Sequence, residues 1–276
     1  MSNVLKMRQS LIGNAETCLK RAAYSLADPV YKTGEARAIG TAYHKALETY
    51  YSLRQDHGFH VPDGFEMASL KLTAYGEFQN EVAKAAESWV WETSLEQCAN
   101  KINAMLDAYF NGGHYWPEGY RVIGTEVSFT HEWHDCHFAH GTIDLVLEDL
   151  NGWTVLVDHK TAGKKWPKDK EDPRKNIQAP WYVYWWSTLN ETKRVFFAFD
   201  VMTYGGTFER RPVQPTLKEQ ELVLAKARFY AGILSTLGPD DLAGNTSSAL
   251  CSERYCDFWS ACVHGAGPLD SSIVMD

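Results

Sequence analysis

Long apolar runs are missing from this 276-residue sequence, and none approaches the roughly 20 residues needed to span a bilayer. The first 17 residues also lack the apolar segment of a secretory signal, so the sequence predicts a cytoplasmic protein without a membrane partner. Disulfides are rare in that compartment. The six cysteines therefore require another explanation.

Excess positive charge is missing too, because the formal net charge is −8. This argues mildly against a general nucleic-acid coat protein, which would normally be basic, but it allows an acidic site beside a locally basic surface. Repeats and low-complexity segments are absent. A hydrophobic content of 45%, with ten Trp and fourteen Tyr, is ample for a large core. We expect a single domain over residues 1–276.

The spacing of apolar residues predicts an α/β fold, with a mainly helical first part and a β-rich part from about residue 119. Helices are expected over residues 8–26 (with Ser10 as N-cap), 36–55, 64–110 (one bent helix or two), 174–190 and 215–237. Strands are expected over residues 120–133, 136–150, 154–160, 193–205 and 206–214. This predicts a helical region over residues 36–115 and a sheet core over residues 119–213. The tail, residues 245–276, shows little regular pattern.

The apolar run "TVLV" ends in charged residues at Asp158 and Lys160. It follows an Asn-Gly turn that allows two hairpins. A two-residue loop would point Asp144 and Asp158 to opposite faces of the sheet, because side chains alternate along a strand. A three-residue loop, Leu150 to Gly152 with Gly152 left-handed, would put them on one face. We expect the three-residue loop, because two carboxylates and an ammonium make a poor core but a good metal site.

Two converging carboxylates are hard oxygen ligands that suit Mg²⁺ or Mn²⁺. A nearby lysine can orient a water molecule and stabilise the charge that develops on a phosphate. Together they are the minimal equipment for metal-assisted phosphodiester hydrolysis. The alternative is an ordinary ion pair at the end of a strand.

Further motifs occur in a characteristic order. "GTAYHKALE" carries His44, "GTIDLV" carries Asp144, "LVDHKT" carries Asp158 and Lys160, and "QAPWY" carries Gln178 and Tyr182. One early cysteine precedes three late ones. In these features the sequence resembles the iron–sulfur members of the RecB-like branch of the PD-(D/E)XK nuclease superfamily. That group includes AddB-type nuclease domains, CRISPR-associated adaptation nucleases and phage exonucleases.

The resemblance implies a restriction-endonuclease-like fold, with a mixed sheet flanked by helices, and a metal-dependent DNA exonuclease. It would act on single strands or DNA ends in phage or prokaryotic recombination or repair, with a partner protein. The resemblance also implies the roles of individual residues. Metal ligands would be His44, Asp144, Asp158 and the backbone carbonyl of His159, and the catalytic group would be Lys160, with Gln178 and Tyr182 as positioning residues on one helix face. Glu126 would be either an additional acid or a solvent-facing strand residue.

The resemblance further implies that four cysteines, Cys18, Cys251, Cys256 and Cys262, ligate a [4Fe–4S] cluster. Such a cluster would clip residue 18 to the C-terminal tail. The late spacing, Cys-x4-Cys-x5-Cys, departs from the shorter first gap typical of the family. Zinc is the competing metal, although paired Cys-x-x-Cys motifs are absent. Unrelated buried thiols are the remaining alternative.

Residues 160–175 contain seven Lys or Arg and three acids, which suggests either a phosphate-binding loop or an ordinary solvated one. The aromatic run "WYVYWW" is expected to be mostly buried. Four histidines in "HEWHDCHFAH" are expected to form a polar hairpin, with a metal site as the alternative reading.

A G-x-x-x-x-G-K-[ST] motif is absent, so the sequence lacks the P-loop of a helicase motor. A stand-alone nuclease is therefore the simplest interpretation. The alternatives are a CRISPR-type adaptation nuclease and a non-catalytic iron–sulfur DNA-binding protein that keeps the fold.

Overall fold

The computed structural model describes residues 4–27, 34–85, 89, 91–134, 137–253 and 255–262. The chain divides into two compact units. Unit 1 comprises residues 1–32, 130–140 and 224–276, and unit 2 comprises residues 33–129 and 141–223. The predicted single domain stays a prediction.

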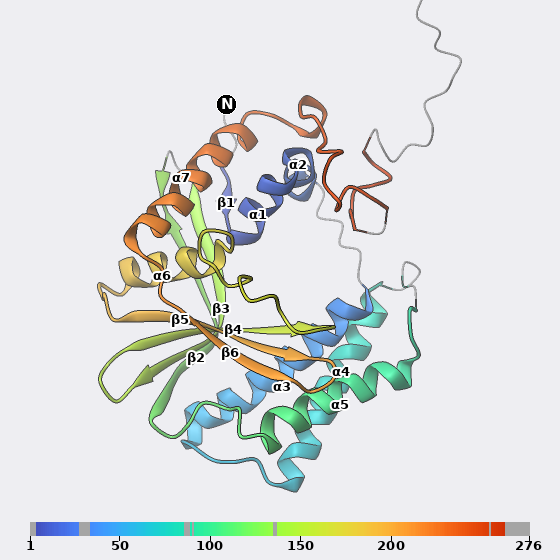
Figure 1. Ribbon diagram of the computed structural model, residues 1–276, viewed down its shortest axis with the longest axis vertical. Coiled ribbons are helices and arrows are strands. Elements are labelled where there is room, and N and C mark those ends of the chain that lie inside the picture. Colours follow the sequence, from blue (N-terminus) through green and yellow to red (C-terminus); the bar gives the residue numbers. More distant parts are fainter. Residues whose placement is uncertain are drawn as a thin grey trace, which may run out of the picture. The chain divides into compact units, whose positions relative to one another are not determined.

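Three helices of unit 2 lie on one face of its sheet (Figure 1): α3 (Glu35–His57), α4 (Gly64–Ala85) and α5 (Leu95–Asn111). The buried residues of α3 recur at helical spacing, from Ala38 and Ile39 to Leu47 and Tyr50, and so form one apolar stripe. At the start of α5, Ser94 and Gln97 form a capping box. The helices predicted over 36–55 and 64–110 are thus confirmed, the latter as two helices.

The strands join in a mixed sheet in the order β1–β3–β4–β5–β6, with β2 paired to β3. Their bounds are β1 (Lys6–Met7), β2 (Tyr120–Glu132), β3 (Phe138–Asp149), β4 (Thr154–Ala162), β5 (Val195–Thr203) and β6 (Phe208–Val213). β4 pairs antiparallel with β3 and parallel with β5, which in turn pairs antiparallel with β6. The mixed α/β prediction is confirmed.

The β3–β4 hairpin has the three-residue loop expected from the sequence. Leu145 pairs with Val157 and Glu148 with Thr154, a register that continues to Asp149 opposite Trp153. The Asp149 amide donates to the Trp153 carbonyl (2.9 Å), and Gly152 has a φ of 75°. A side chain at Gly152 would be strained in this left-handed conformation.

The alternation of side chains along β3 and β4 separates the two faces of the sheet. Leu145, Leu147, Val155 and Val157 belong to the apolar core that also contains the buried side chains of α3, α4 and α5. Residues between them point to the opposite face. There α6 (Gln178–Leu189) packs on β5, and Tyr182 stacks on Phe197 at 6.1 Å.

Unit 1 contains α1 (Gln9–Thr17), α2 (Leu19–Ala27) and β1, which pairs with the first residues of β3. The single helix predicted over residues 8–26 is wrong, because the backbone at Cys18 is extended (φ −162°, ψ 112°) and separates two helices. Ser10 is not the N-cap either. Arg8 occupies that position, with no capping bond from its side chain. The interruption makes Cys18 the junction between α1 and α2.

Two other helix boundaries differ from the predictions. The helix predicted from residue 174 begins at Gln178, because Arg174 and Lys175 lie in turns held by local polar contacts. The helix predicted over residues 215–237 is shorter at both ends, as α7 (Leu217–Leu234), and a short 3₁₀ helix, η3 (Pro239–Asp241), follows it. Among the described residues, no helix is long and apolar enough to cross a membrane.

Candidate active site

Asp144 of β3 is the meeting point of two predicted site residues in unit 2. Its Oδ2 accepts a hydrogen bond from the His159 amide (2.8 Å) and lies 3.5 Å from Nδ1 of His44 on α3. The β3–β4 register, continued by one residue pair, sets Asp144 opposite Asp158. Burial lowers the pKa of His44, against the opposing effect of the Asp144 carboxylate. The neutral imidazole that results is the form that binds metals.

Asp158 of β4 contacts two other predicted site residues, Lys160 and Gln178. Its side chain is only 7% exposed, and its Oδ2 lies 2.5 Å from the ammonium of Lys160. The amide of Gln178, at the start of α6, donates to its other oxygen. Burial raises the pKa of Asp158 above its usual range. Burial alone would lower the pKa of Lys160, but the carboxylates of Asp158 and Asp144 raise it, so the lysine stays charged.

The His159 side chain points to the opposite face from Asp158, as the alternation predicts. Its ring is stacked on Tyr51 at 6.1 Å and meets His44 and Tyr109 edge-on. Neither ring nitrogen has a hydrogen-bond partner among the described residues, and burial lowers its pKa to about 3. Only the backbone of His159 therefore reaches the Asp144 side of the sheet.

Glu126 of β2 lines an acidic cleft of about 400 Å³ together with His44 and Asp144. Two further acids line it, Glu48 and Glu77, which the sequence analysis did not identify. Glu48 follows His44 by four residues on α3, so its helical spacing was a usable signal. Glu77 comes from α4 and no local pattern connects it to the site. Glu126 is exposed, as the solvent-facing reading expects, and it also lies beside the other acids of the cleft.

The environment of Glu126 is unusual in two respects. Its φ of 48° is a left-handed conformation that only a few per cent of non-glycine residues adopt. Burial, followed by the nearby Asp144 and Glu48 carboxylates, raises its pKa to about 7. The cleft therefore concentrates more negative charge than its single lysine, Lys45, offsets.

Tyr182 is buried on the α6 side of the sheet. Besides stacking on Phe197, its ring lies edge-on to Phe129 (6.2 Å), and both rings fill the space where a Cβ at Gly141 would be. Burial raises the pKa of Tyr182.

Most of the run "WYVYWW" is buried, as predicted, including Trp181 and Trp185. These aromatic side chains serve the core of unit 2.

Comparison with known proteins identifies the architecture. The model of the PD-(D/E)XK nuclease superfamily matches residues 12–263. The chain belongs to this superfamily. Its mixed sheet and flanking helices agree with the restriction-endonuclease-like fold of the group.

Two solved structures resemble this PD-(D/E)XK protein at a low level. The crystal structure of SSO0001 has 13% identity and a TM-score of 0.35, and the match covers 92% of this chain and 95% of that one. A proposed exonuclease from Eubacterium rectale has 12% identity and a TM-score of 0.40, with 83% and 88% covered. At these values neither bears on function. No protein with a curated description matches the chain.

PD-(D/E)XK nucleases typically use divalent metals, and the acidic cleft has suitable donors for one. Asp144 and Glu126 supply carboxylates within the cleft, and His44 supplies an imidazole. Asp158 of β4, opposite Asp144 in the hairpin, supplies a further carboxylate beside it. Burial raises the pKa of Glu126 most, and the neighbouring carboxylates add a repulsion that a cation would relieve. The predicted ligands are close together but not preformed as a site. Within the described residues, no three His, Cys, Asp or Glu side chains are arranged to hold a metal.

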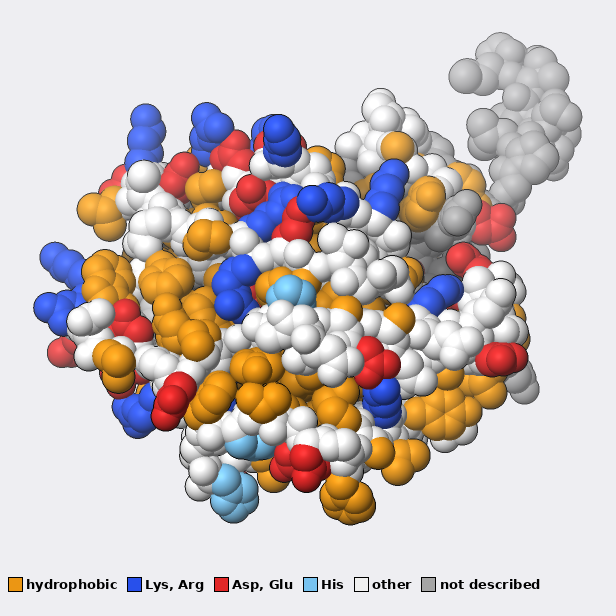
Figure 2. Space-filling model, turned by 60° about the horizontal axis from the view of Figure 1, so that its bottom comes forward, with side chains coloured by type: hydrophobic (Ala, Val, Ile, Leu, Met, Phe, Trp, Pro, Cys, Tyr) orange, Lys and Arg blue, Asp and Glu red, His pale blue; other side chains and the backbone are white. Residues whose placement is uncertain are grey.

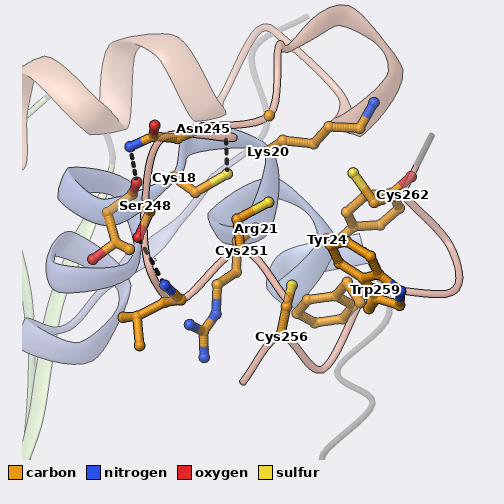
Figure 3. Close-up of a pocket in the computed structure, with 14 residues that line it drawn as sticks. Cys18, Lys20, Arg21, Tyr24, Asn245, Ser248, Cys251, Cys256, Trp259 and Cys262 are labelled. Atoms are coloured by element: carbon orange, nitrogen blue, oxygen red, sulfur yellow. Dashed lines mark hydrogen bonds between the residues drawn. The ribbon is translucent and has the colours of Figure 1, made fainter. Parts of the chain in front are cut away.

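The four predicted cluster ligands meet in unit 1. Cys18, Cys251, Cys256 and Cys262 line one small pocket, which also contains Tyr24 (Figure 3). Burial raises the pKa of Cys251, and neighbouring thiolates of the other three cysteines raise it further. Four thiols within electrostatic range fit a four-thiolate group in chemistry. They do not form a ready ligand set, since the described residues contain no preformed metal group.

The described part of the histidine-rich segment, residues 131–134 and 137–140, covers the end of β2 and the start of β3, which pair with each other. Residues 135 and 136 lie outside the described residues. His137 is buried and accepts a hydrogen bond from the Leu5 amide at 3.2 Å. Nδ1 of His140 lies 2.9 Å from the Thr130 hydroxyl across the hairpin. These two histidines thus have structural partners.

Proposed function

We propose that this PD-(D/E)XK protein is a Mg²⁺- or Mn²⁺-dependent DNA exonuclease. The observation that carries the proposal is the alignment of Asp144 and Asp158 across the β3–β4 hairpin, with Lys160 beside Asp158 and His44 beside Asp144. A divalent metal held by the carboxylates would act as a Lewis acid toward the scissile phosphate.

The side chains of the chain itself then have distinct tasks. Asp144, Asp158, His44 and the backbone carbonyl of His159 would hold the metal. Lys160 would orient the attacking water and stabilise the negative charge that develops on the phosphate. Gln178 would orient Asp158 through its amide hydrogen bond. Tyr182 would support that helix face through its packing on the sheet.

The test is cleavage of end-labelled single-stranded and duplex DNA with Mg²⁺, with Mn²⁺ and with chelator. We expect metal-dependent release of terminal nucleotides, and a loss of 10²-fold or more in Lys160→Ala, because removal of one such stabilising group typically costs that much. Lys218→Ala, an exposed lysine of α7, is the matched control. Full activity in Lys160→Ala would refute the mechanism. Binding without cleavage would favour the non-catalytic alternative.

The finer assignment is to the RecB-like branch, with action in phage or prokaryotic recombination or repair in the cytoplasm. The order of the His44, Asp144, Asp158–Lys160 and Gln178–Tyr182 motifs supports this assignment. A circular single-stranded substrate would separate the exonuclease from an endonuclease, because only the latter would cleave it.

We further propose that Cys18, Cys251, Cys256 and Cys262 hold a [4Fe–4S] cluster. Their common pocket and the mutual electrostatic influence of their thiols support this assignment. The cluster would tie the α1–α2 junction to the C-terminal tail, where η3 is the only regular element among the described residues after α7. Its contribution would be structural.

Anaerobically purified protein should be brown, absorb near 400 nm and contain about four iron atoms per chain. Cys251→Ser should lose this absorbance, whereas Cys98→Ala should keep it, because Cys98 lies buried in unit 2. A colourless protein with one bound zinc would contradict the cluster and favour the Cys₄ zinc alternative.

A further inference from the structure

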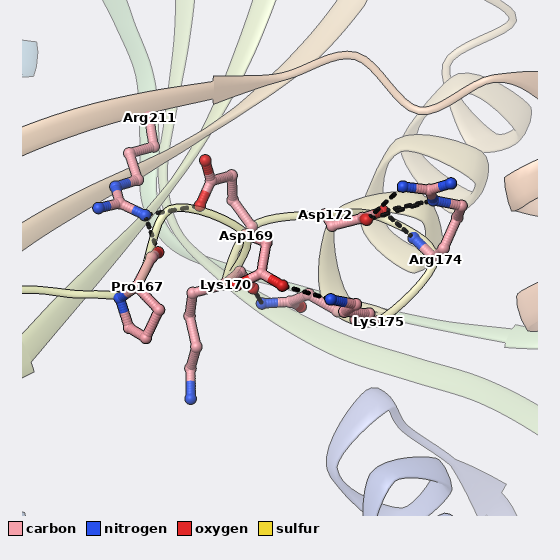
Figure 4. Close-up of polar contacts among 9 residues, drawn as sticks. Pro167, Asp169, Lys170, Asp172, Arg174, Lys175 and Arg211 are labelled. Carbon is pink, nitrogen blue, oxygen red and sulfur yellow. Dashed lines mark hydrogen bonds and ion pairs between the residues drawn. The ribbon is translucent and has the colours of Figure 1, made fainter.

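The loop between β4 and α6, residues 163–177, is tied to β6 by hydrogen bonds and ion pairs. Arg211 of β6 donates to the carbonyls of Trp166 (2.9 Å) and Pro167 (2.6 Å; Figure 4). The same guanidinium pairs with Glu171 and Glu209, both at 2.6 Å. Its side chain is only 13% exposed. The loop is therefore anchored to the sheet, unlike the ordinary solvated loop that the sequence also allowed.

The acids of this loop are all engaged in ion pairs. Glu171 pairs with Arg211, Asp169 with Lys175, and Asp172 with Arg174. In Figure 4, Lys175 and Arg174 turn onto these carboxylates. Since each acid is already neutralised by a partner, none is left to offset the remaining lysines.

Three lysines of the loop have no such partner. Lys164, Lys168 and Lys170 are exposed, and none makes an ion pair within the described part of the chain. Lys170 extends away from the paired residues in Figure 4, with its ammonium 5.7 Å from the Trp166 ring centroid. The Trp166 ring packs on Phe199 at 5.4 Å. The fixed loop thus presents three uncompensated positive charges.

This charge is local. The chain as a whole carries a net charge of −8, and on the face shown in Figure 2 Lys and Arg lie interspersed with Asp and Glu. The loop, in contrast, connects Lys160 at one end with Gln178 at the other, so its lysines are tethered to the candidate active site. Lys164 follows Lys160 by four residues and lies within about 14 Å of it even in a fully extended chain.

We propose that Lys164, Lys168 and Lys170 form a surface that binds the phosphate backbone of the substrate strand beyond the scissile phosphate. This proposal rests on the proposed nuclease function. Lysine ammoniums bind phosphates as point charges, so the surface would act without sequence preference. A strand carries one phosphate per about 3.4 Å of rise in a duplex, so the contacts would fall a few nucleotides from the cleavage point.

The test measures binding of a fluorescein-labelled 20-nucleotide single strand by anisotropy, without divalent metal, between 50 and 200 mM salt. Each lost phosphate contact lowers the slope of log affinity against log salt by about 0.7. The variant K164Q/K168Q/K170Q should therefore lose about 2 from this slope and about 100-fold in affinity at 0.1 M salt. The matched control, K193Q/K218Q, removes two exposed lysines of unit 2 outside the loop and should keep the wild-type slope.

Substrate length supplies an independent readout. With Mg²⁺ or Mn²⁺, the triple variant should raise KM for the 20-nucleotide strand and leave kcat, and the cleavage of a dinucleotide, unchanged. An unchanged slope in the triple variant, or an equal loss in the control, would overturn the lysine surface while leaving the nuclease intact. If the wild-type protein neither binds nor cleaves DNA, the proposed function itself fails.

Discussion

Glu126→Gln is predicted to stabilise the metal-free protein at alkaline pH, although it removes a residue from the candidate active site. The pKa of Glu126 is raised from 4.5 to about 7 by burial and by the neighbouring carboxylates. The folded protein therefore binds this proton more tightly than the unfolded chain does. Stability from this linkage is present below about pH 4.5 and is lost as the pH rises through 7.

The pKa change sets the magnitude of this effect. A rise from 4.5 to about 7 corresponds to at most about 3.4 kcal/mol. We expect about 1–2 kcal/mol, because Glu126 is exposed and solvent screens its repulsion from Asp144 and Glu48. At pH 8 the Gln variant should unfold at a temperature higher by about 2–8 °C. The difference should vanish near pH 4.5.

The assay is thermal unfolding in EDTA between pH 4.5 and 8. Glu221→Gln, an exposed glutamate of α7, is the control and should show no pH-dependent difference from the wild type. With saturating Mn²⁺ the unfolding temperature of the wild type should rise to that of the Gln variant, since the cation offsets the repulsion among the carboxylates. A Gln variant that is less stable than the wild type at pH 8, or a gain that is independent of pH, would refute the electrostatic reasoning.

Two further predictions concern the hairpin and the buried ion pair. Deletion of Asn151 should shorten the loop to Leu150 and Gly152 and keep Asp149 opposite Trp153, so Asp144 should stay opposite Asp158. Nuclease activity should then be retained, and its loss with an unchanged far-UV circular dichroism would contradict the register argument. Asp200→Ala should cost about 3–5 kcal/mol in urea unfolding, because Asp200 is 1% exposed and would leave the Arg210 guanidinium, paired at 2.7 Å, without its carboxylate. A cost below 1 kcal/mol would show that the pair is not needed.

The sequence by itself determined the local geometry of the hairpin. The Asn-Gly turn allowed two hairpins of opposite parity, because side-chain alternation has a strict period of two. The charges at Asp144, Asp158 and Lys160 favoured the three-residue loop, which brings Asp144 opposite Asp158. The same parity directed the His159 ring away from that face. Helix positions in unit 2 also followed from apolar spacing, since each helix buries one stripe of side chains.

The tertiary structure alone decided what lies around those residues. Glu77 of α4 lines the cleft with Asp144, although no local pattern links the two. Arg211 of β6 anchors a loop some 40 positions earlier in the sequence. The break at Cys18 interrupts a segment whose spacing favours one continuous helix. In each case the deciding contact joins segments far apart in the chain, and periodicity records only which face a side chain occupies, not which segment it meets.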